Sequence, residues 1–571
     1  MWYNLVLKEG VFVKAKRIIG LSLAISSLLS LSSCSFLNDL LTIDFYGPTT
    51  TDDEDVLTSY EDLGNYYIDL DPITSKCNNK LINNSIYADA VPSVGDVNLL
   101  VIPVEFSDYT FEYAGYSSDE VLYDDLNRVY NGTEEDTGYF TSVSDFYKNS
   151  SYGKLNLSFE IAPKYELGMT AKQLKNLDLK SDVDKSTYVL EKAVDDYKNK
   201  YGNDKVKQFD NDSDGLIDGV MLIYSCHNTG NSEYSTFAKN VGDSGDLYWA
   251  YCYWDNENGQ EKFYYAKNNK AGHKSNSELI ESPIPCTYFW CSYDFIYSYS
   301  SCEIGGNVDS HTLDHEFGHM LGLDDYYSYD DSTYYGNEYS RAGYADMMEG
   351  NIYDHDAYSK AVLGWINPYV VTGDCTISIR SSALYGDCII LANNYNGTVY
   401  DEYIMLELFT PEGMNKNDVL YPYSSNIPTC FTNPGVKIFH IDSRLVNSKT
   451  GKEGTYSFIN KQSIDLNYAY KFAYSNSKNR DALSTDYDLI KLIHKDKSTG
   501  NLNSTSFFGD NSSYYGKNKH LFTKNDEFSV SSYKSLFKNN GKLDNNEELN
   551  YTITILQANS SGAVIEFKQN K

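Results

Sequence analysis

The pattern of apolar and polar positions differs between the two halves of the chain. Residues 99–106 and 219–224 are continuous apolar runs that predict buried strands, and residues 155–161 alternate as a further strand does. Residues 142–147 and 171–201 carry apolar positions at helical spacing. The first structured region, which we take as residues 96–368, is therefore predicted to have an α+β fold.

From residue 369 onward, short apolar runs are separated by turns. The runs are residues 376–379, 388–391, 403–406, 436–441, 551–556 and 563–567. Such spacing is typical of a β-sandwich, so residues 369–571 are predicted to form a β-rich C-terminal region. Residues 447–532 are polar and predict a loop-rich insertion within it.

The layout of residues 1–34 predicts a bacterial export signal. A basic patch precedes the apolar run 18–31, and the sequence Leu-Ser-Ser-Cys that ends at Cys34 resembles the lipobox of lipoproteins. Lipidation of Cys34 would anchor the chain on a membrane, whereas an ordinary secretory signal with an incidental cysteine is the alternative. Residues 35–95 have little periodicity and predict a tether or leader segment.

Charge and cysteine content narrow the classes of function. The chain has 571 residues, with 80 Asp and Glu against 47 Lys and Arg, a formal net charge of -33. Such acidity argues against binding of nucleic acid or of anionic membranes through charge. Export would permit disulfides among the ten cysteines, but their pairing cannot be read from sequence. The thiol of Cys77 is a candidate to cap a bound metal ion in a latent form of the protein, although a lone cysteine in a flexible segment rarely has this role.

The most informative motif is His315-Glu316-x-x-His319. Residues four apart share one face of a helix, so both imidazoles can bind one ion, and neutral imidazole suits zinc. Glu316 then takes the place of a general base that removes a proton from water and returns it to the leaving amine. A surface helix that happens to carry two histidines is the alternative interpretation of these five residues.

The residues after the motif predict the third ligand. Gly322 favours a left-handed turn that ends the helix, and such a turn lets the chain return and present Asp325 to the metal. Asp324 and Glu338 are lesser candidates. His311 also shares the helical face, but it lies two turns from His319, about 12 Å along the axis, too far to share one zinc.

Two methionines after the motif and one distant histidine are further candidates for the site. Met348 is predicted to pack beneath the metal, with Met347 as the alternative, and the whole pattern resembles the metzincin arrangement with Asp in the third position. His440 lies in an apolar run, and a buried strand histidine is a better interpretation of it than a further metal ligand.

An acidic loop precedes the strand at residues 219–224. Asp210, Asp212 and Asp214 alternate before a glycine, as in the first half of a calcium loop, and Asp218 is a candidate for a later ligand. Met221 occupies the twelfth position, which excludes a complete EF-hand. The sequence predicts a structural Ca²⁺ site, with an acidic surface turn as the alternative.

Taken in order, these motifs resemble the immune inhibitor A-type family of secreted bacterial metallopeptidases. The resemblance covers about residues 97–445, and the matching segments are 101–108, 144–147, 150–155, 210–218, 315–325, 346–348, 360–365, 402–407 and 435–442. One departure is Asp324, where the family often has Pro. The resemblance implies a metzincin-like zinc peptidase domain with structural calcium, followed by a β-rich region.

The functional prediction is a secreted or cell-surface zinc endopeptidase that acts on protein or peptide substrates. His315, His319 and Asp325 would hold Zn²⁺, with Glu316 as the base and Gly322 and Met348 in structural roles. The chain would act on the extracellular face of a bacterial membrane, attached only through its lipid anchor, or be released. A non-catalytic adhesin or glycan-binding lipoprotein is the alternative; an intact Glu316 argues against it.

Overall fold

The computed structural model describes most of the chain beyond residue 90. The described residues are 66–67, 91–133, 142–230, 234–243, 245, 247–254, 276–329, 341–423, 429–447, 458, 470–477, 487–498 and 515–570. The predicted export signal with Cys34, and also Cys77 and Glu338, lie outside them. Among the described residues, no helix has both the length and the apolar character that crossing a bilayer requires.

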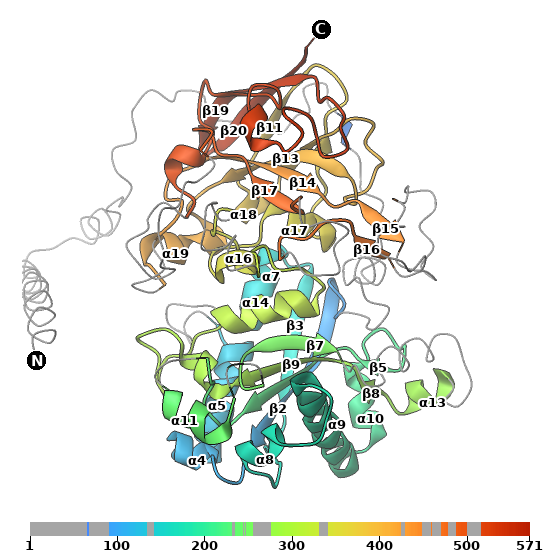
Figure 1. Cartoon of the computed structure of the whole chain (residues 1–571), viewed down its shortest axis with the longest axis vertical. Coiled ribbons are helices and arrows are strands. Elements are labelled where there is room, and N and C mark those ends of the chain that lie inside the picture. Colours follow the sequence, from blue (N-terminus) through green and yellow to red (C-terminus); the bar gives the residue numbers. More distant parts are fainter. Residues whose placement is uncertain are drawn as a thin grey trace, which may run out of the picture. The chain divides into compact units, whose positions relative to one another are not determined.

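A mainly parallel sheet organises the first half of the described chain (Figure 1). Its order is β3 (Leu155–Ile161), β2 (Gly95–Glu105), β6 (Val220–Tyr224), β9 (Thr287–Ser292) and β7 (Tyr251–Trp254). Among the described strands of this sheet, β7 alone runs antiparallel, at the edge beside β9. The short strand β4 (Tyr165–Glu166) also pairs with β2.

Alternate side chains of the central strands enter two separate cores. On β2, Leu99 and Val101 belong to one apolar cluster, and Leu100 and Ile102 belong to the other. Because strand side chains alternate between faces, a strand covered on both sides reads as a continuous apolar run. This is why residues 99–106 have no polar alternation.

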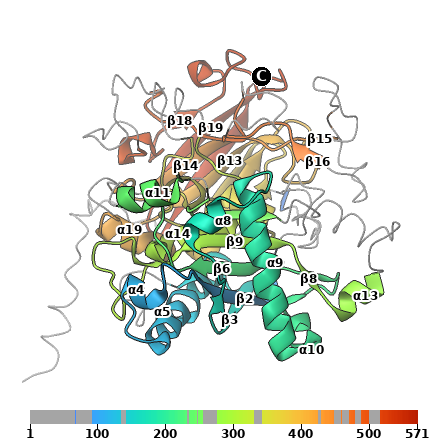
Figure 2. The ribbon, with the colours of Figure 1, turned by 60° about the horizontal axis from the view of Figure 1, so that its bottom comes forward.

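Helices cover both faces of this sheet. One face carries α5 (Asp119–Asn131), α7 (Val143–Ser150) and α14 (His311–Met320), and the other carries α8 (Ala171–Lys175) and α9 (Asp182–Tyr201). Figure 2 shows α9 crossing the strands. The shorter elements here are α4 (Phe111–Ala114), α10 (Asn203–Val206), η1 (Lys207–Phe209), β5 (Leu216–Ile217), α11 (Ser235–Val241), α13 (Asn276–Glu281), β8 (Ile284–Pro285) and η3 (Tyr293–Tyr297).

Two further sheets share an apolar cluster in the second half. One has the order β1 (Tyr66–Tyr67), β10 (Tyr369–Val370), β12 (Cys388–Leu391), β13 (Glu402–Phe409), β14 (Gly435–Asp442) and β17 (Ile490–Leu492). The other has the order β11 (Cys375–Ile379), β20 (Gly562–Gln569), β19 (Tyr551–Asn559) and β18 (Glu527–Phe528). Side chains of both sheets, such as Ile404 on β13 and Ile565 on β20, meet in that cluster.

Short elements surround these sheets. They are α16 (Met347–Gly350), α17 (Ala357–Val362), α18 (Ser382–Tyr385), η4 (Gly413–Asn415), α19 (Lys416–Leu420), β15 (Leu445–Asn447), β16 (Tyr470–Phe472), η7 (Asn518–His520) and η8 (Lys534–Leu536). Strand β13 is buried along its whole length, because its other face packs toward the first half. Met405 of β13 and Phe317 of α14 belong to one core, so α14 lies between the two halves (Figure 1).

The helix predicted over residues 171–201 is interrupted in the structure. Helix α8 ends at Lys175, and α9 begins at Asp182 after Ser181, whose side chain accepts a hydrogen bond from the backbone N–H of Asp184. Serine is a favoured N-cap because its oxygen satisfies a free N–H of the first turn. The sequence did not indicate this break, because apolar residues have helical spacing on both sides of it.

Leu406 tests the packing between the two C-terminal sheets. Its side chain is fully buried in their shared cluster. We expect Leu406→Ala to lower the free energy of unfolding by about 2–5 kcal/mol, since it removes buried methyl groups and leaves a cavity. Urea unfolding measures this change. Leu556→Ala is the control, because Leu556 on β19 is 41% exposed; equal losses in the two variants would contradict the shared core.

Candidate metal centre

Helix α14 and the turn after it arrange the donor atoms of the site. The helix ends after Met320, and Gly322 adopts a left-handed conformation with φ of 98°. Its backbone N–H donates to the carbonyl of His319 at 2.8 Å, and that of Leu323 donates to the carbonyl of Gly318 at 3.0 Å. Glycine adopts this conformation at little cost. The turn brings the chain back so that Asp325 faces the helix.

Three donor atoms form a nearly equilateral triangle. The Oδ1 atom of Asp325 lies 3.1 Å from Nε2 of His315 and 3.2 Å from Nε2 of His319, and the two Nε2 atoms are 3.2 Å apart. A tetrahedral zinc with ligands at about 2.0–2.1 Å separates them by about 3.3 Å. His315, His319 and Asp325 therefore have the spacing of three ligands of one zinc ion.

Hydrogen bonds to the backbone direct the imidazole lone pairs into this triangle. Nδ1 of His315 lies 2.8 Å from the carbonyl of Met347, and Nδ1 of His319 lies 2.8 Å from the carbonyl of Leu323. A carbonyl only accepts, so Nδ1 carries a proton, and in the neutral ring Nε2 carries the lone pair. Oδ1 of Asp325 is buried without a hydrogen-bond partner among the described residues. Three acceptors facing one point, two of them on the buried residues His315 and Asp325 and one on the partly buried His319, fit a cation.

The electrostatics of the triangle also favour a positive charge. Burial opposes protonation of His319, but the Asp325 carboxylate outweighs it and raises the pKa of His319 to about 10. Burial likewise opposes ionisation of Asp325, yet His319 and His315 hold the pKa of its carboxyl well below the ordinary range. In the absence of metal, a proton occupies the place of the cation.

Glu316 lies beside the triangle and is held by the edge strand β7. Its Oε2 accepts a hydrogen bond of 2.9 Å from the backbone N–H of Cys252. Burial raises the pKa of Glu316, although His315 and His319 partly offset the effect. A carboxyl group with a raised pKa is a better proton acceptor at neutral pH than an exposed one.

The two methionines after α14 contact the site in different ways. Met347 contributes its carbonyl to His315, whereas the side chain of Met348 packs on α14. A Cβ atom on Gly318 would lie 2.4 Å from Sδ of Met348, so the helix accepts this thioether only where it has glycine. Asp346 caps α16 by accepting from the backbone N–H of Met348. The motif glycine and the methionine therefore form one contact.

The rival ligands lie outside the triangle. The carboxylate of Asp324 accepts from the hydroxyl of Ser475 and from the backbone N–H of Asp325. His311 is near the other end of α14, where its Nδ1 lies 2.8 Å from Asp309 and its ring stacks on Tyr423. The geometry therefore favours Asp325 over Asp324 and His311.

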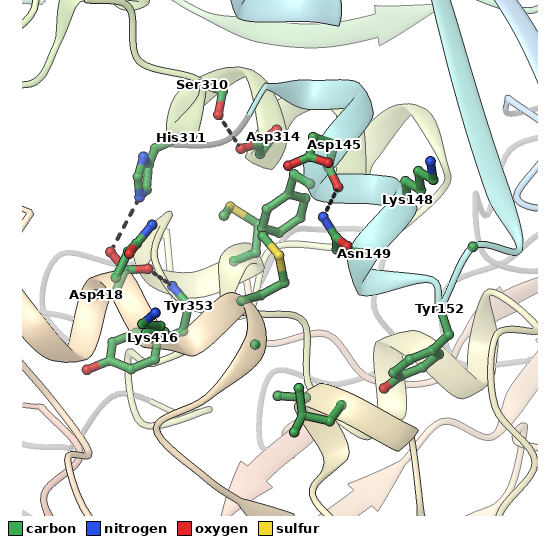
Figure 3. A pocket seen from close by; sticks show the side chains of 18 residues that line it. Asp145, Lys148, Asn149, Tyr152, Ser310, His311, Asp314, Tyr353, Lys416 and Asp418 are labelled. Carbon is green, nitrogen blue, oxygen red and sulfur yellow. Dashed lines mark hydrogen bonds and ion pairs between the residues drawn. The ribbon is translucent and has the colours of Figure 1, made fainter. Parts of the chain in front are cut away.

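A cavity of about 470 Å³ lies at the N-terminal end of α14 (Figure 3). His311 and Asp314 line it from the helix, Asp145 from α7, and Asp418 from α19. The residues of the triangle are not among its lining residues. The cavity therefore does not include the three donor residues, although His311 and Asp314 lie on the same helix as His315 and His319.

The acidic loop brings three of its four candidate ligands together. Carboxylate oxygens of Asp210, Asp212 and Asp214 lie within 4.8 Å of one another. Asp218 is not in that group; its Oδ2 accepts from the backbone N–H of Asn211 at 2.6 Å and from the side-chain amide of Asn211 at 2.8 Å. Asp218 thus closes the loop as an acceptor, a role that sequence spacing did not indicate.

Two further groups of potential ligands come from residues far apart in sequence. They are Glu402 with His440 and Asp544, and His494 with Asp496 and His520. His440 lies 3.0 Å from Glu402, whose other oxygen lies 3.5 Å from Arg444. An arginine in contact disfavours a metal, which fits the interpretation of His440 as a buried strand histidine. Sequence spacing gives no signal for either group.

Comparisons with known proteins add no name to this geometry. No family model matches the chain, and no curated protein matches it. The arrangement of the donor atoms therefore carries the functional conclusion.

The two adjacent aspartates provide the first test of the metal centre. We expect Asp325→Ala to abolish tight zinc binding, because it removes the third donor, and Asp324→Ala to retain one zinc per chain. Metal content after dialysis against a weak chelator measures both. Loss of zinc in Asp324→Ala alone would contradict the assignment of Asp325.

The pKa of His319 predicts how zinc affinity depends on pH. Zinc displaces the proton that His319 holds up to a pKa of about 10. The apparent affinity should therefore rise about tenfold per pH unit between about pH 6.5 and 8.5. The protonated histidine also stabilises the zinc-free fold, fully below about pH 6.5 and progressively less as pH rises toward 10. Chelator competition measures the affinity, and a flat profile would contradict the raised pKa.

Proposed function

We propose that this chain is a zinc-dependent endopeptidase that hydrolyses peptide bonds of extracellular proteins. The observation that carries the proposal is the triangle formed by Nε2 of His315, Nε2 of His319 and Oδ1 of Asp325, with Glu316 next to the first ligand in sequence. A site with three protein ligands leaves a fourth tetrahedral position open, as in catalytic zinc sites, whereas structural sites are closed by four.

His315, His319 and Asp325 would hold the zinc, which supplies Lewis-acid polarisation of the scissile carbonyl and lowers the pKa of water. Glu316 would supply the proton transfer. Its Oε2 is engaged by the N–H of Cys252, which orients the carboxylate and leaves Oε1 to take a proton from water. The same group then returns the proton to the leaving amine.

The surroundings of Glu316 support both halves of that transfer. Burial raises the pKa of its carboxyl, so the protonated form is less costly than in an exposed glutamate. A positive charge held between His315 and His319 lowers the same pKa and so opposes the neutral form of the carboxyl. A base that must accept a proton and then release it near neutral pH benefits from this balance.

The remaining parts of the proposal rest on sequence. The export signal and Cys34 support an extracellular location, either anchored through lipid or released. The order of the motifs, which resembles that of the immune inhibitor A-type metallopeptidases, supports protein or peptide substrates. Asp210, Asp212 and Asp214 support a structural Ca²⁺ ion, since alternating carboxylates with a following glycine suit that cation.

Glu316→Gln tests the proposed base. The substitution keeps an oxygen that can accept from Cys252 but removes the proton acceptor. We expect zinc content to stay at the wild-type level and cleavage of denatured casein to fall by about 10²–10⁴-fold. Glu548→Gln is the control, because that side chain is 59% exposed.

Wild-type behaviour in the same assay separates the proposal from its alternative. A wild-type chain that holds zinc and cleaves neither casein nor other denatured proteins would contradict the peptidase and favour a non-catalytic adhesin. If Glu316→Gln keeps the wild-type activity, the role of Glu316 is contradicted, but the peptidase proposal itself is not.

A further inference from the structure

The third ligand, Asp325, lies on an irregular loop, and contacts from the C-terminal half hold that loop in place. We call residues 323–329 the metal loop and residues 473–477 the clamp segment. The clamp segment directly follows β16 and precedes β17, so it belongs to the strands of the C-terminal half. It lies about 150 residues beyond the metal loop in sequence.

Three hydrogen bonds join the two segments. The hydroxyl of Ser475 donates to Oδ2 of Asp324 at 2.5 Å, and the side-chain amide of Asn476 donates to the carbonyl of Tyr326 at 3.0 Å. The backbone N–H of Tyr329 donates to the carbonyl of Ser477 at 3.0 Å. The clamp segment thus contacts the metal loop immediately before Asp325, immediately after it, and again at Tyr329.

Asn476 links these contacts to the C-terminal sheet. Its Oδ1 accepts from the backbone N–H of Ile490 at 3.1 Å, and its amide also donates to the carbonyl of Ile490 at 2.9 Å. Ile490 is the first residue of β17 and pairs with Ile441 of β14. Asn476 is fully buried, so these hydrogen bonds are shielded from competition with water. The position of Tyr326 is therefore tied to the register of the sheet.

Tyr329 connects the clamp segment directly to the carboxylate of Asp325. Its hydroxyl donates to Oδ2 of Asp325, while Oδ1 of the same carboxylate faces the two histidines. With Oδ2 engaged, the carboxylate presents one oxygen to the metal. Hydrogen bonds to the ligating groups of a metal site orient them and commonly change metal affinity by about 10–100-fold.

We propose that the clamp segment positions Asp325 as a zinc ligand. It does so through Asn476 and through the hydrogen bond between Ser477 and Tyr329. The inference rests on the proposed function, because it concerns the same zinc site. It assigns the C-terminal strands a direct part in holding the metal, and it makes Asn476 and Tyr329 positioning residues.

Asn476→Ala in the full-length chain tests the clamp. It removes the donor to Tyr326, and we expect the dissociation constant for zinc to rise about 10–100-fold. Asn415→Ala is the matched control. Asn415 is also buried, donates to the carbonyl of Thr410 and accepts from the N–H of Asp354, but it has no bond to the metal loop. We expect it to lower thermal stability comparably and to leave zinc affinity within about threefold of wild type, well short of that range.

Tyr329→Phe provides an independent variant, because it removes one hydroxyl from a residue that is 56% exposed. We expect weaker zinc binding and, in the cobalt-substituted protein, a changed visible spectrum, since the ligand field reports how Asp325 coordinates. Tyr113→Phe, at a side chain that is 67% exposed, is its control. If Asn476→Ala does not fold, the Tyr329→Phe comparison decides alone.

The outcomes separate the two proposals. A wild-type chain that binds no zinc at His315, His319 and Asp325 overturns the proposed function and the clamp together. A wild type that binds zinc and cleaves protein, with Asn476→Ala and Tyr329→Phe matching their controls in affinity and cobalt spectrum, overturns the clamp alone.

Discussion

The hydrogen bonds that place the proton on Nδ1 of His315 and His319 are the interactions on which the rest of the centre depends. They leave the Nε2 lone pairs directed at Oδ1 of Asp325, within 3.2 Å. Both acceptors are backbone carbonyls, from Met347 and from Leu323. The turn at Gly322 and the short helix α16 therefore act on the metal centre through peptide groups, which side-chain substitution does not remove. A shift of either carbonyl would let the proton move to Nε2 and would oppose a cation.

The packing around α14 keeps those carbonyls in place. Met348 occupies the space that a side chain at position 318 would fill, so the distance between α14 and α16 is set by direct contact of a thioether with helix backbone. Met405 of β13 and Phe317 of α14 share the same core, so the C-terminal sheet supports the helix from behind. Close-packed interiors transmit small displacements, and a metal centre with donor atoms about 3 Å apart tolerates few of them.

Part of this arrangement could be predicted from local sequence. The spacing of His315 and His319 follows from helix geometry, and Gly322 indicated where the chain would turn back toward the helix. The strands at residues 155–161 and 388–391 coincide with β3 and β12 because their apolar patterns are short and bounded by turns. Asp218 was different: its spacing suited a calcium ligand, but it is not grouped with Asp210, Asp212 and Asp214, and its Oδ2 accepts from Asn211. The position of this carboxylate depends on a loop conformation that spacing does not specify.

The clamp segment lies in a stretch, residues 447–532, whose polarity predicted only a loop-rich insertion. The two histidines lie on a helix that satisfies its own backbone, so four-residue spacing suffices to bring them together. Asp325 lies on a loop, whose backbone lacks the regular hydrogen bonds of a helix. The loop therefore needs hydrogen-bond partners from elsewhere in the chain to adopt one conformation. Ser475, Asn476 and the carbonyl of Ser477 are those partners, and their polarity is a requirement of that role. In a chain of this kind, polar residues inserted between strands can be as necessary to the site as its ligands, and only tertiary structure identifies them.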